Sequence, residues 1–161
     1  MAVDMFIKIG DVKGESTDDK HKGEIDVLSW SWGATQSGTS GIGGGAGAGK
    51  VQLQDLTFTH YVDCATPILF KMCCDGTHIP KVKLVVRKAG GSALEYLTLD
   101  IENALVSGVS TGGSGGQDRI TENVTLNFAK VKIEYKPQTA KGAGEAAITQ
   151  GWDASANKSW T

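Results

Sequence analysis

The stretch from residue 110 to residue 136 joins a glycine–serine loop to an unusually long alternating pattern. Apolar residues first occupy even positions, as Val124, Leu126 and Phe128. After residues 129–130 they occupy odd positions instead. Alternation with a period of two places one set of side chains on a core and the other set toward water. A slip of one residue is typical of a β-bulge, which bends a strand and exchanges its buried face. The stretch therefore predicts one long, strongly curved strand.

Two further strand patterns, at residues 25–32 and 51–58, slip in the same way near Leu28 and near Asp55. Three slips in one small chain predict strands that are curved strongly enough to close on themselves. More alternating segments lie at residues 3–9, 82–87 and 96–109. We therefore expect a mainly β fold: a small closed antiparallel β-barrel of curved, bulged strands, with one short α-helix packed beside it.

The helix is expected to begin at Thr66, which is a good N-cap residue and is followed by Pro67. Gly76 is placed to end the helix in the left-handed conformation. Four apolar residues share one face at helical spacing, namely Ile68, Leu69, Met72 and Cys73. That face should pack against the sheet.

A length of 161 residues fits one domain, which we place at residues 1–161. Residues 137–161 form a polar C-terminal tail with a possible last short strand near Ile148 and Trp152. The formal net charge of −2 argues against electrostatic capture of nucleic acid or of an anionic membrane. The N-terminus lacks the features of a secretory signal peptide, and no apolar run reaches the ~18 residues of a membrane anchor.

No catalytic, cofactor-binding or metal-binding residues are predicted. The histidines at positions 21, 60 and 78 accompany no nucleophile signature such as G-x-S-x-G. Residues 44–50, GGAGAGK, fit the phosphate-loop spacing GxxxxGK, but Val51 stands where that loop needs a hydroxyl for Mg²⁺. Arg119 and Glu122 are expected to form an ordinary surface ion pair. The cysteines fit no zinc spacing and are expected to be small, buried and reduced: Cys64, Cys73 and Cys74.

A glycine-dominated loop is expected from Gln36 to Lys50. Loops of this length in a compact domain are usually functional or disordered. Glycine-rich backbone can lie flat against another surface and become ordered on contact. The loop therefore favours an interaction role over a catalytic one.

Several long segments together resemble the hemolysin co-regulated protein family, whose members are the tail-tube subunits of bacterial type VI secretion systems. The matching segments are MAVDMFIKIGDVKGES at residues 1–16, IDVLSWSWG at 25–33, the glycine loop through residue 50, VQLQDLTFTHYVDCATPIL at 51–69, RKAGG at 87–91, and STGGSGGQDRITENVTLNFAKVKIEY at 110–135. The resemblance covers nearly the whole chain. It implies a small β-barrel with one helix beside it, in agreement with the pattern of alternation.

The resemblance implies a mechanical role. Six subunits form a ring around a lumen, rings stack into a tube beneath a spike, and a contractile sheath drives the tube into a target cell. Members also carry effector proteins inside the ring. The resemblance further implies folding in the bacterial cytoplasm and export by the secretion machine itself. Nucleic acid and membrane anchors are not expected as partners.

Two sets of residues are expected to serve this role. Ring stacking is assigned to the glycine loop, at Gln36, Ser37, Gly38, Gly43, Gly44, Gly45, Gly47, Gly49 and Lys50. Contact with cargo in the lumen is assigned from the matching segments and from small polar chemistry, at Ser31, Ser110, Thr111, Ser114 and Gly115. The alternative is a monomeric secreted β-barrel that binds a small ligand in an interior cavity.

Overall fold

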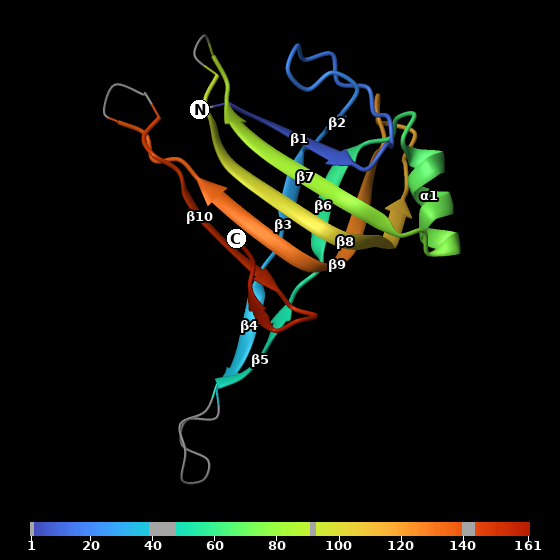
Figure 1. Ribbon diagram of the computed structural model, residues 1–161. Helices are drawn as coiled ribbons and strands as arrows, with labels where there is room; N and C mark the ends of the chain where they lie inside the picture. Colours follow the sequence, from blue (N-terminus) through green and yellow to red (C-terminus); the bar gives the residue numbers. More distant parts are fainter. Residues whose placement is uncertain (1, 39–47, 91–92, 140–143) are drawn as a thin grey trace.

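The computed structural model describes residues 2–38, 48–90, 93–139 and 144–161 (Figure 1). Its single described α-helix is α1 (Thr66–Asp75). The strands are β1 (Val3–Ile9), β2 (Ile25–Asp26), β3 (Ser29–Ser31), β4 (Ala34–Gly38), β5 (Ala48–Leu53), β6 (Leu56–Tyr61), β7 (Ile79–Lys88), β8 (Glu95–Thr111), β9 (Thr121–Tyr135), β10 (Ile148–Asp153) and β11 (Lys158–Ser159). No helix among the described residues is long and apolar enough to cross a membrane.

All paired strands are antiparallel, and most of them belong to one nine-stranded sheet. Its main path runs β11-β10-β9-β8-β7-β1-β2, while β6 pairs with both β9 and β3. Strand β9 therefore has β8 along one edge, and β6 and then β10 along the other. The mainly β, antiparallel fold with one short helix is confirmed, and full closure of the barrel stays a prediction.

The bend of the β8–β9 hairpin differs from the predicted bulge. The buried face of β9 does change between Phe128 and Val131. However, the two strands keep their register there, and Asn103 of β8 takes a left-handed φ of 57°. The register shift lies further along, between Val106 and Gly108. Both strands thus turn together at the expected place, and the extra residue is accommodated elsewhere.

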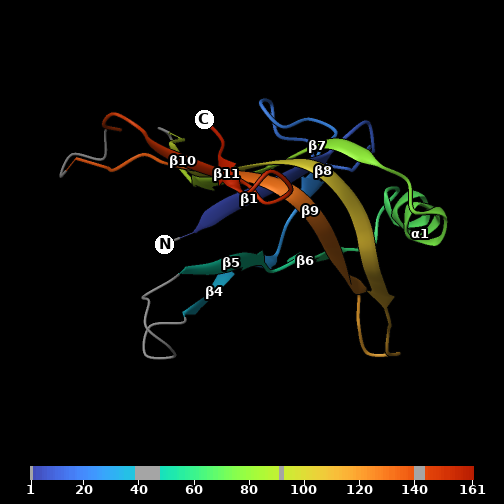
Figure 2. The ribbon, with the colours of Figure 1, turned by 60° about the horizontal axis from the view of Figure 1, so that its bottom comes forward.

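The other two slips divide a long hairpin into short strands. The first breaks residues 25–31 into β2 and β3, and the second separates β5 from β6 at residues 54–55. Strand β3 pairs with β6, and beyond the break β4 pairs with β5 as a separate two-stranded sheet. This distal part projects away from the main sheet (Figures 1 and 2).

Buried apolar side chains fill the space between the strands. Strands β1, β6, β7, β8 and β9 supply most of them, and α1 contributes Leu69, which is fully buried. Each such side chain stabilises the fold by roughly 1.5–3 kcal/mol relative to exposure. The largest fully buried residues include Phe58, Ile7, Ile9, Leu56, Leu84, Leu99, Ile101 and Leu126.

Helix α1 begins differently from the prediction. Ala65 is the N-cap residue and makes no side-chain cap. The Thr66 hydroxyl instead accepts the N–H of Asp63 and donates to Glu122. Gly76 ends the helix with a φ of 66°, as predicted. Ile68, which was placed on the packed face, is 50% exposed.

Two further expectations can be compared with the structure. The cysteines were expected to be buried, but Cys64 and Cys74 are exposed and Cys73 is half-buried. In the tail, the segment around Ile148 and Trp152 forms β10, which pairs with the second half of β9.

Candidate assembly and cargo surfaces

The outward face of β3, β6, β9 and β8 carries small uncharged polar residues. Residues opposite each other in paired strands point to the same side of a sheet. One such row runs Ser29, Thr59, Asn123 and Ser110, and the next runs Ser31, Thr57, Thr125 and Gly108. We call the seven polar members of these rows the polar wall. The opposite side of the same strands is the core.

Hydrogen bonds between strands fix some of these side chains. The Thr59 hydroxyl donates to Asn123 Oδ1 at 2.5 Å, and the hydroxyls of Thr57 and Thr125 lie 3.3 Å apart. At one end of the wall, Asp55 accepts hydrogen bonds from Ser107 and Asn127. The polar wall is therefore an ordered surface of hydroxyl and amide groups.

The structure brings together some of the residues assigned to the lumen. Ser31 and Ser110 both lie on the polar wall. Ser114 and Gly115 lie in the exposed turn between β8 and β9. Thr111 is one residue beyond Ser110, and its hydroxyl donates to Glu122 on the other side of the sheet. Sequence reasoning missed the rest of the wall, although the alternation of TFT and NVT signals it: Ser29, Thr57, Thr59, Asn123 and Thr125.

The residues assigned to ring stacking lie on the projecting β4–β5 hairpin where the structure describes them. Gln36, Ser37 and Gly38 belong to β4, while Gly49 and Lys50 belong to β5. Most are exposed. The predicted loop is thus partly strand. Four assigned positions lie outside the described residues: Gly43, Gly44, Gly45 and Gly47.

Glycine is required at one of these positions by close approach of the strands. A Cβ atom at Gly49 would collide with the backbone oxygen and the hydroxyl of Ser37. At Gly38, in contrast, a Cβ atom would meet nothing within 4 Å. The glycine content of this hairpin therefore has a structural cause at residue 49.

An apolar groove of about 370 Å³ lies between the β4–β5 hairpin and the paired strands β9 and β10. Its walls include Trp32, Val51, Leu53, Val131, Ile133 and Trp152. The indole Nε1 atoms of Trp32 and Trp152 are buried and lack a hydrogen-bond partner. Figure 2 shows the hairpin on one side of this space and β10 on the other. We call this feature the apolar groove.

A buried polar cluster connects the helix to the end of the β8–β9 hairpin. Glu122 is 1% exposed and receives hydrogen bonds from the hydroxyls of Thr66 and Thr111, both at 2.8 Å. His60 Nε2 lies 2.6 Å from the same carboxylate. Burial raises the pKa of the nearby Asp63 carboxyl. The prediction of a surface ion pair between Arg119 and Glu122 is therefore wrong, because Glu122 is buried.

Arg119 lies on an aromatic ring instead. Its guanidinium carbon is 3.8 Å from the ring centroid of Tyr61, which is a cation–π contact. Because Tyr61 alternates with Thr57 and Thr59 along β6, it continues the column of side chains that forms the polar wall.

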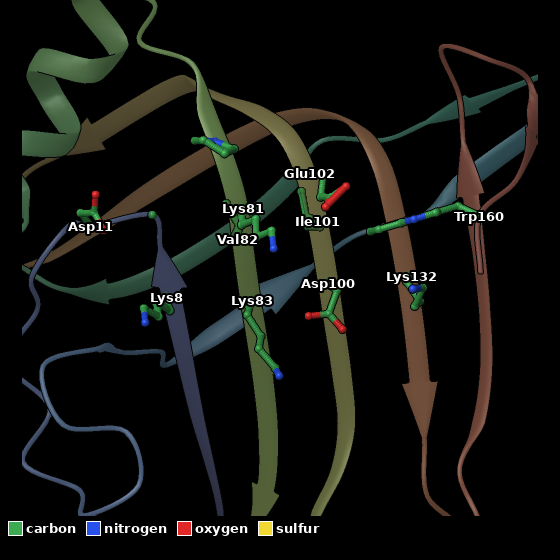
Figure 3. A pocket seen from close by; sticks show the side chains of 12 residues that line it. Lys8, Asp11, Lys81, Val82, Lys83, Asp100, Ile101, Glu102, Lys132 and Trp160 are labelled. Atoms are coloured by element: carbon green, nitrogen blue, oxygen red, sulfur yellow. The ribbon is translucent and has the colours of Figure 1, made fainter.

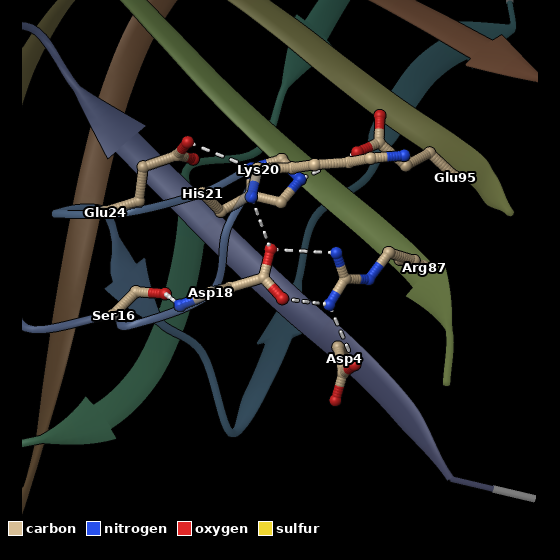
Figure 4. A network of polar contacts seen from close by, with 8 residues as sticks. All are labelled: Asp4, Ser16, Asp18, Lys20, His21, Glu24, Arg87 and Glu95. Carbon is tan, nitrogen blue, oxygen red and sulfur yellow. Dashed lines mark hydrogen bonds and ion pairs between the residues drawn. The ribbon is translucent and has the colours of Figure 1, made fainter. Parts of the chain in front are cut away.

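A second polar cluster anchors the connection between β1 and β2 (Figure 4). Arg87 donates two hydrogen bonds to Asp18, at 2.9 and 2.6 Å, and a third to Asp4. The hydrogen bonds from Arg87 lower the pKa of Asp18 to about 2 and raise that of Arg87. His21 stacks on Phe6 with ring centroids 4.4 Å apart.

The ring nitrogens of His21 face two carboxylates. Nδ1 lies 2.9 Å from Glu24 and Nε2 lies 2.7 Å from Glu95. His21 and His60 are thus both held by carboxylates. Among the described residues, no group of three or more His, Cys, Asp and Glu side chains is arranged to hold a metal ion.

Residues 6–135 match the family described as "Type VI secretion system effector, Hcp". The chain belongs to the Hcp family. The resemblance to hemolysin co-regulated proteins is therefore confirmed, and the matched region contains the polar wall. Protein hcp1 of Pseudomonas aeruginosa is 59% identical over 155 residues, which are 95% of this chain and 96% of that protein.

Solved Hcp structures share the fold over the full length of the chain. A type six secretion system protein has a TM-score of 0.93 at 33% identity, with 99% of this chain and 100% of that chain covered. Hcp1 from Salmonella typhimurium has a TM-score of 0.80 at 42% identity, with the same coverage. The strand arrangement described above is thus shared with Hcp proteins of type VI secretion.

Proposed function

We propose that this Hcp protein is the structural subunit of the type VI tail tube. Six copies form a ring, rings stack into a tube, and the tube is expelled into a target cell. Effector proteins bind the ring lumen and are carried out with it. The role is one of assembly and carriage and not of catalysis. Membership of the Hcp family supports its place in type VI secretion.

The polar wall is the observation that carries the proposal. Its four strands end in two open edges. Within the described residues, β3 pairs only with β6, and residues 105–111 of β8 pair only with β9. Unpaired N–H and C=O groups at such edges can be joined by a neighbouring chain. A head-to-tail contact of this kind forms a closed ring when the rotation from one subunit to the next divides a full turn into equal steps. The ring then has the polar wall on its inner side.

The chemistry of the wall suits passage of a protein cargo. Hydroxyl and amide groups can exchange hydrogen bonds with water and with a folded protein alike. The wall presents no large apolar side chain at its seven positions, so a cargo is held without strong hydrophobic adhesion.

The apolar groove supports contact between copies of the chain. Exposed apolar surface of this kind is usually covered by a partner. We assign a neighbouring subunit of the same ring as the partner, because the β4–β5 hairpin projects beyond the main sheet and can reach a second copy (Figure 1).

Closure of the barrel is part of the proposal. At one end, residues 25–31 pair with β1, where the N–H of Val27 donates to Met5 at 2.9 Å. At the other end they pair with β6, where the N–H of Leu28 donates to Thr59 at 2.8 Å. This segment bridges β1 and β6, which supports a closed wall of strands.

The far end of the projecting hairpin, at residues 36–38 and 49–50, is the proposed contact between stacked rings, whereas its base, at Val51 and Leu53, contributes to the proposed contact within the ring. The spike at the tube tip and the contractile sheath are the proposed partners of the stacked tube. Export from the cytoplasm by the secretion machine follows from this role. The alternative, a monomer with an interior ligand site, is not favoured because buried apolar side chains fill the interior.

Native mass spectrometry followed by electron microscopy of the same material tests the proposal. A mass of six chains with annular particles is the expected result. A monomer that persists at high protein concentration would contradict the ring and favour the ligand-binding alternative.

A further inference from the structure

A groove of about 560 Å³ crosses β1, β7, β8 and β9 on the face that bears charged side chains (Figure 3). Val82 and Ile101 also line it, although their side chains belong to the core. Trp160 stands at one end. This surface lies at the open end of the β8–β9 hairpin, whereas the polar wall lies near the turn that joins the two strands. We call it the lysine groove.

Lysines are placed against one another in this groove. Lys8 of β1 lies directly opposite Lys83 of β7 in the strand register, and Lys81 follows two residues along on the same face. Like charges in directly opposed positions destabilise a sheet. Within the described residues none of these three lysines forms an ion pair, and all three are exposed. Across β7 and β8, Lys81 lies directly opposite Glu102 and Lys83 directly opposite Asp100, so part of this positive charge is balanced within the sheet.

The carboxylates of the groove balance these charges only in part. Four lysines and three carboxylates line it. Asp100 lies between Lys83 and Lys132 in the register of the three strands. Lys130, a fifth lysine at the same surface, lies 3.9 Å from Glu102 and 3.8 Å from Asp153. In a chain with a net charge of −2, this surface keeps an excess of positive charge.

Trp160 adds a fixed aromatic wall. Its ring lies 4.3 Å from Lys132 Nζ and 5.4 Å from Lys130 Nζ, both cation–π contacts. Its backbone N–H donates to Gly151 at 3.0 Å, which ties the C-terminal segment to β10. The indole is thus held at the end of a row of cations.

We propose that the lysine groove binds an acidic, extended segment of a partner protein. Carboxylates of the segment pair with Lys8, Lys81 and Lys83, and an apolar or aromatic side chain packs against Trp160. From β1 to β9 the groove spans three strand spacings, about 14 Å, which matches about four extended residues. A single small anion would contact only one end of this row.

Fluorescence anisotropy with the full-length protein tests the proposal. The probe is a short labelled peptide with a run of glutamates followed by one phenylalanine. Its comparison peptides replace the glutamates by glutamines, or the phenylalanine by alanine. At low salt the acidic peptide should bind and the glutamine peptide should not, because ion pairs supply most of the affinity.

The variant Lys8→Gln/Lys83→Gln should weaken binding of the acidic peptide at least about tenfold. It should be about as stable as the wild type, because it removes one like-charge pair, Lys8 with Lys83, together with one opposite-charge pair, Lys83 with Asp100. Loss of binding then cannot be ascribed to unfolding. Lys20→Gln/Lys22→Gln is the matched control, since it changes the net charge equally at two exposed positions outside the groove.

The variant Trp160→Ala should weaken binding of the peptide that carries phenylalanine and leave binding of the peptide that carries alanine unchanged. An equal loss of binding in the Lys20→Gln/Lys22→Gln control would overturn the proposal, since attraction would then be non-specific. Tighter binding of a single-stranded DNA oligonucleotide to the same lysines would also overturn it, in favour of nucleic acid. Native mass spectrometry of each variant shows whether it still forms the ring, so that a loss of peptide binding can be told apart from a loss of assembly.

Discussion

At the residue scale, Glu122 is the side chain whose environment departs most from its type. It is a carboxylate in the core, held by His60, Thr66 and Thr111. Its even position on β9 matches those of Val124 and Leu126, so the alternation itself signals burial. We nevertheless expected a surface pair with Arg119, because charged residues are rarely buried. The pattern located the residue, but only the structure could supply its partners.

Removal of this carboxylate should strongly destabilise the fold. We expect Glu122→Leu to lower the free energy of unfolding by about 3–5 kcal/mol, because it leaves buried polar partners without an acceptor. Urea denaturation provides the measurement. Asn123→Ala, one residue away on the exposed face, should lower the free energy of unfolding by only about 0.5–1.5 kcal/mol, because it removes one exposed hydrogen bond from Thr59. Similar values for both variants would contradict the buried cluster.

Asp18 should make the stability of the protein depend on acid pH. Its pKa is about 2 in the fold, against 3.8 ordinarily, because Arg87 donates hydrogen bonds to it. The ionised carboxylate therefore stabilises the fold above a pH of about 4, and this contribution is lost as the pH falls toward about 2. Asp18→Asn should flatten this part of the stability profile in urea titrations. Asp19→Asn, its exposed neighbour, serves as the control and should retain the wild-type slope.

At the element scale, the sequence predicted where strands bend better than how they bend. The change of buried face at residues 129–130 is visible in the sequence of β9 alone. The backbone conformation that accompanies it belongs to Asn103 on the partner strand, which no single-strand pattern reveals. The glycine-rich hairpin was read as loop because glycine is depleted in strands. Pairing of β4 with β5 overrides that preference.

The close approach of Gly49 to Ser37 leads to a prediction about the stability of the β4–β5 hairpin. Gly49→Ala should separate β4 from β5, since its Cβ atom would collide with Ser37. We expect opening of the hairpin to become easier by about 1–3 kcal/mol, the usual cost of overpacking. Hydrogen exchange of amides in residues 34–38 and 48–53 reports this change. Gly38→Ala, in the same hairpin but with free space, should leave exchange unchanged. Equal protection in both variants would argue against the strand contact.

At the scale of the whole molecule, each proposed contact of the tube can be broken separately. Val51 lines the apolar groove and is half-buried in the isolated chain. Val51→Asp should abolish the six-chain mass while the monomer stays folded, because a charge would be buried against the neighbouring subunit. Native mass spectrometry reports the six-chain mass, and circular dichroism reports whether the monomer is folded. Gln52→Asp, on the adjacent exposed position, should preserve the ring.

The stacking proposal has its own test. A photo-reactive amino acid at Gly38 should form cross-links between subunits in assembled tubes and not in isolated rings. The same amino acid at Lys71, an exposed residue of α1, is the comparison. Cross-links at Gly38 that are equally abundant without stacking would assign the hairpin to contacts within the ring. Gel electrophoresis after illumination distinguishes these results.

The β8–β9 hairpin runs without interruption from the polar wall to the lysine groove. The two surfaces lie on the same pair of strands, joined by covalent backbone and by a ladder of hydrogen bonds that has one register shift between them, at Val106 to Gly108. They cannot slide past each other without breaking that ladder. In the proposed tube, thrust applied at the lysine groove would therefore pass through these strands to the polar wall, so that the tube and its cargo would advance together.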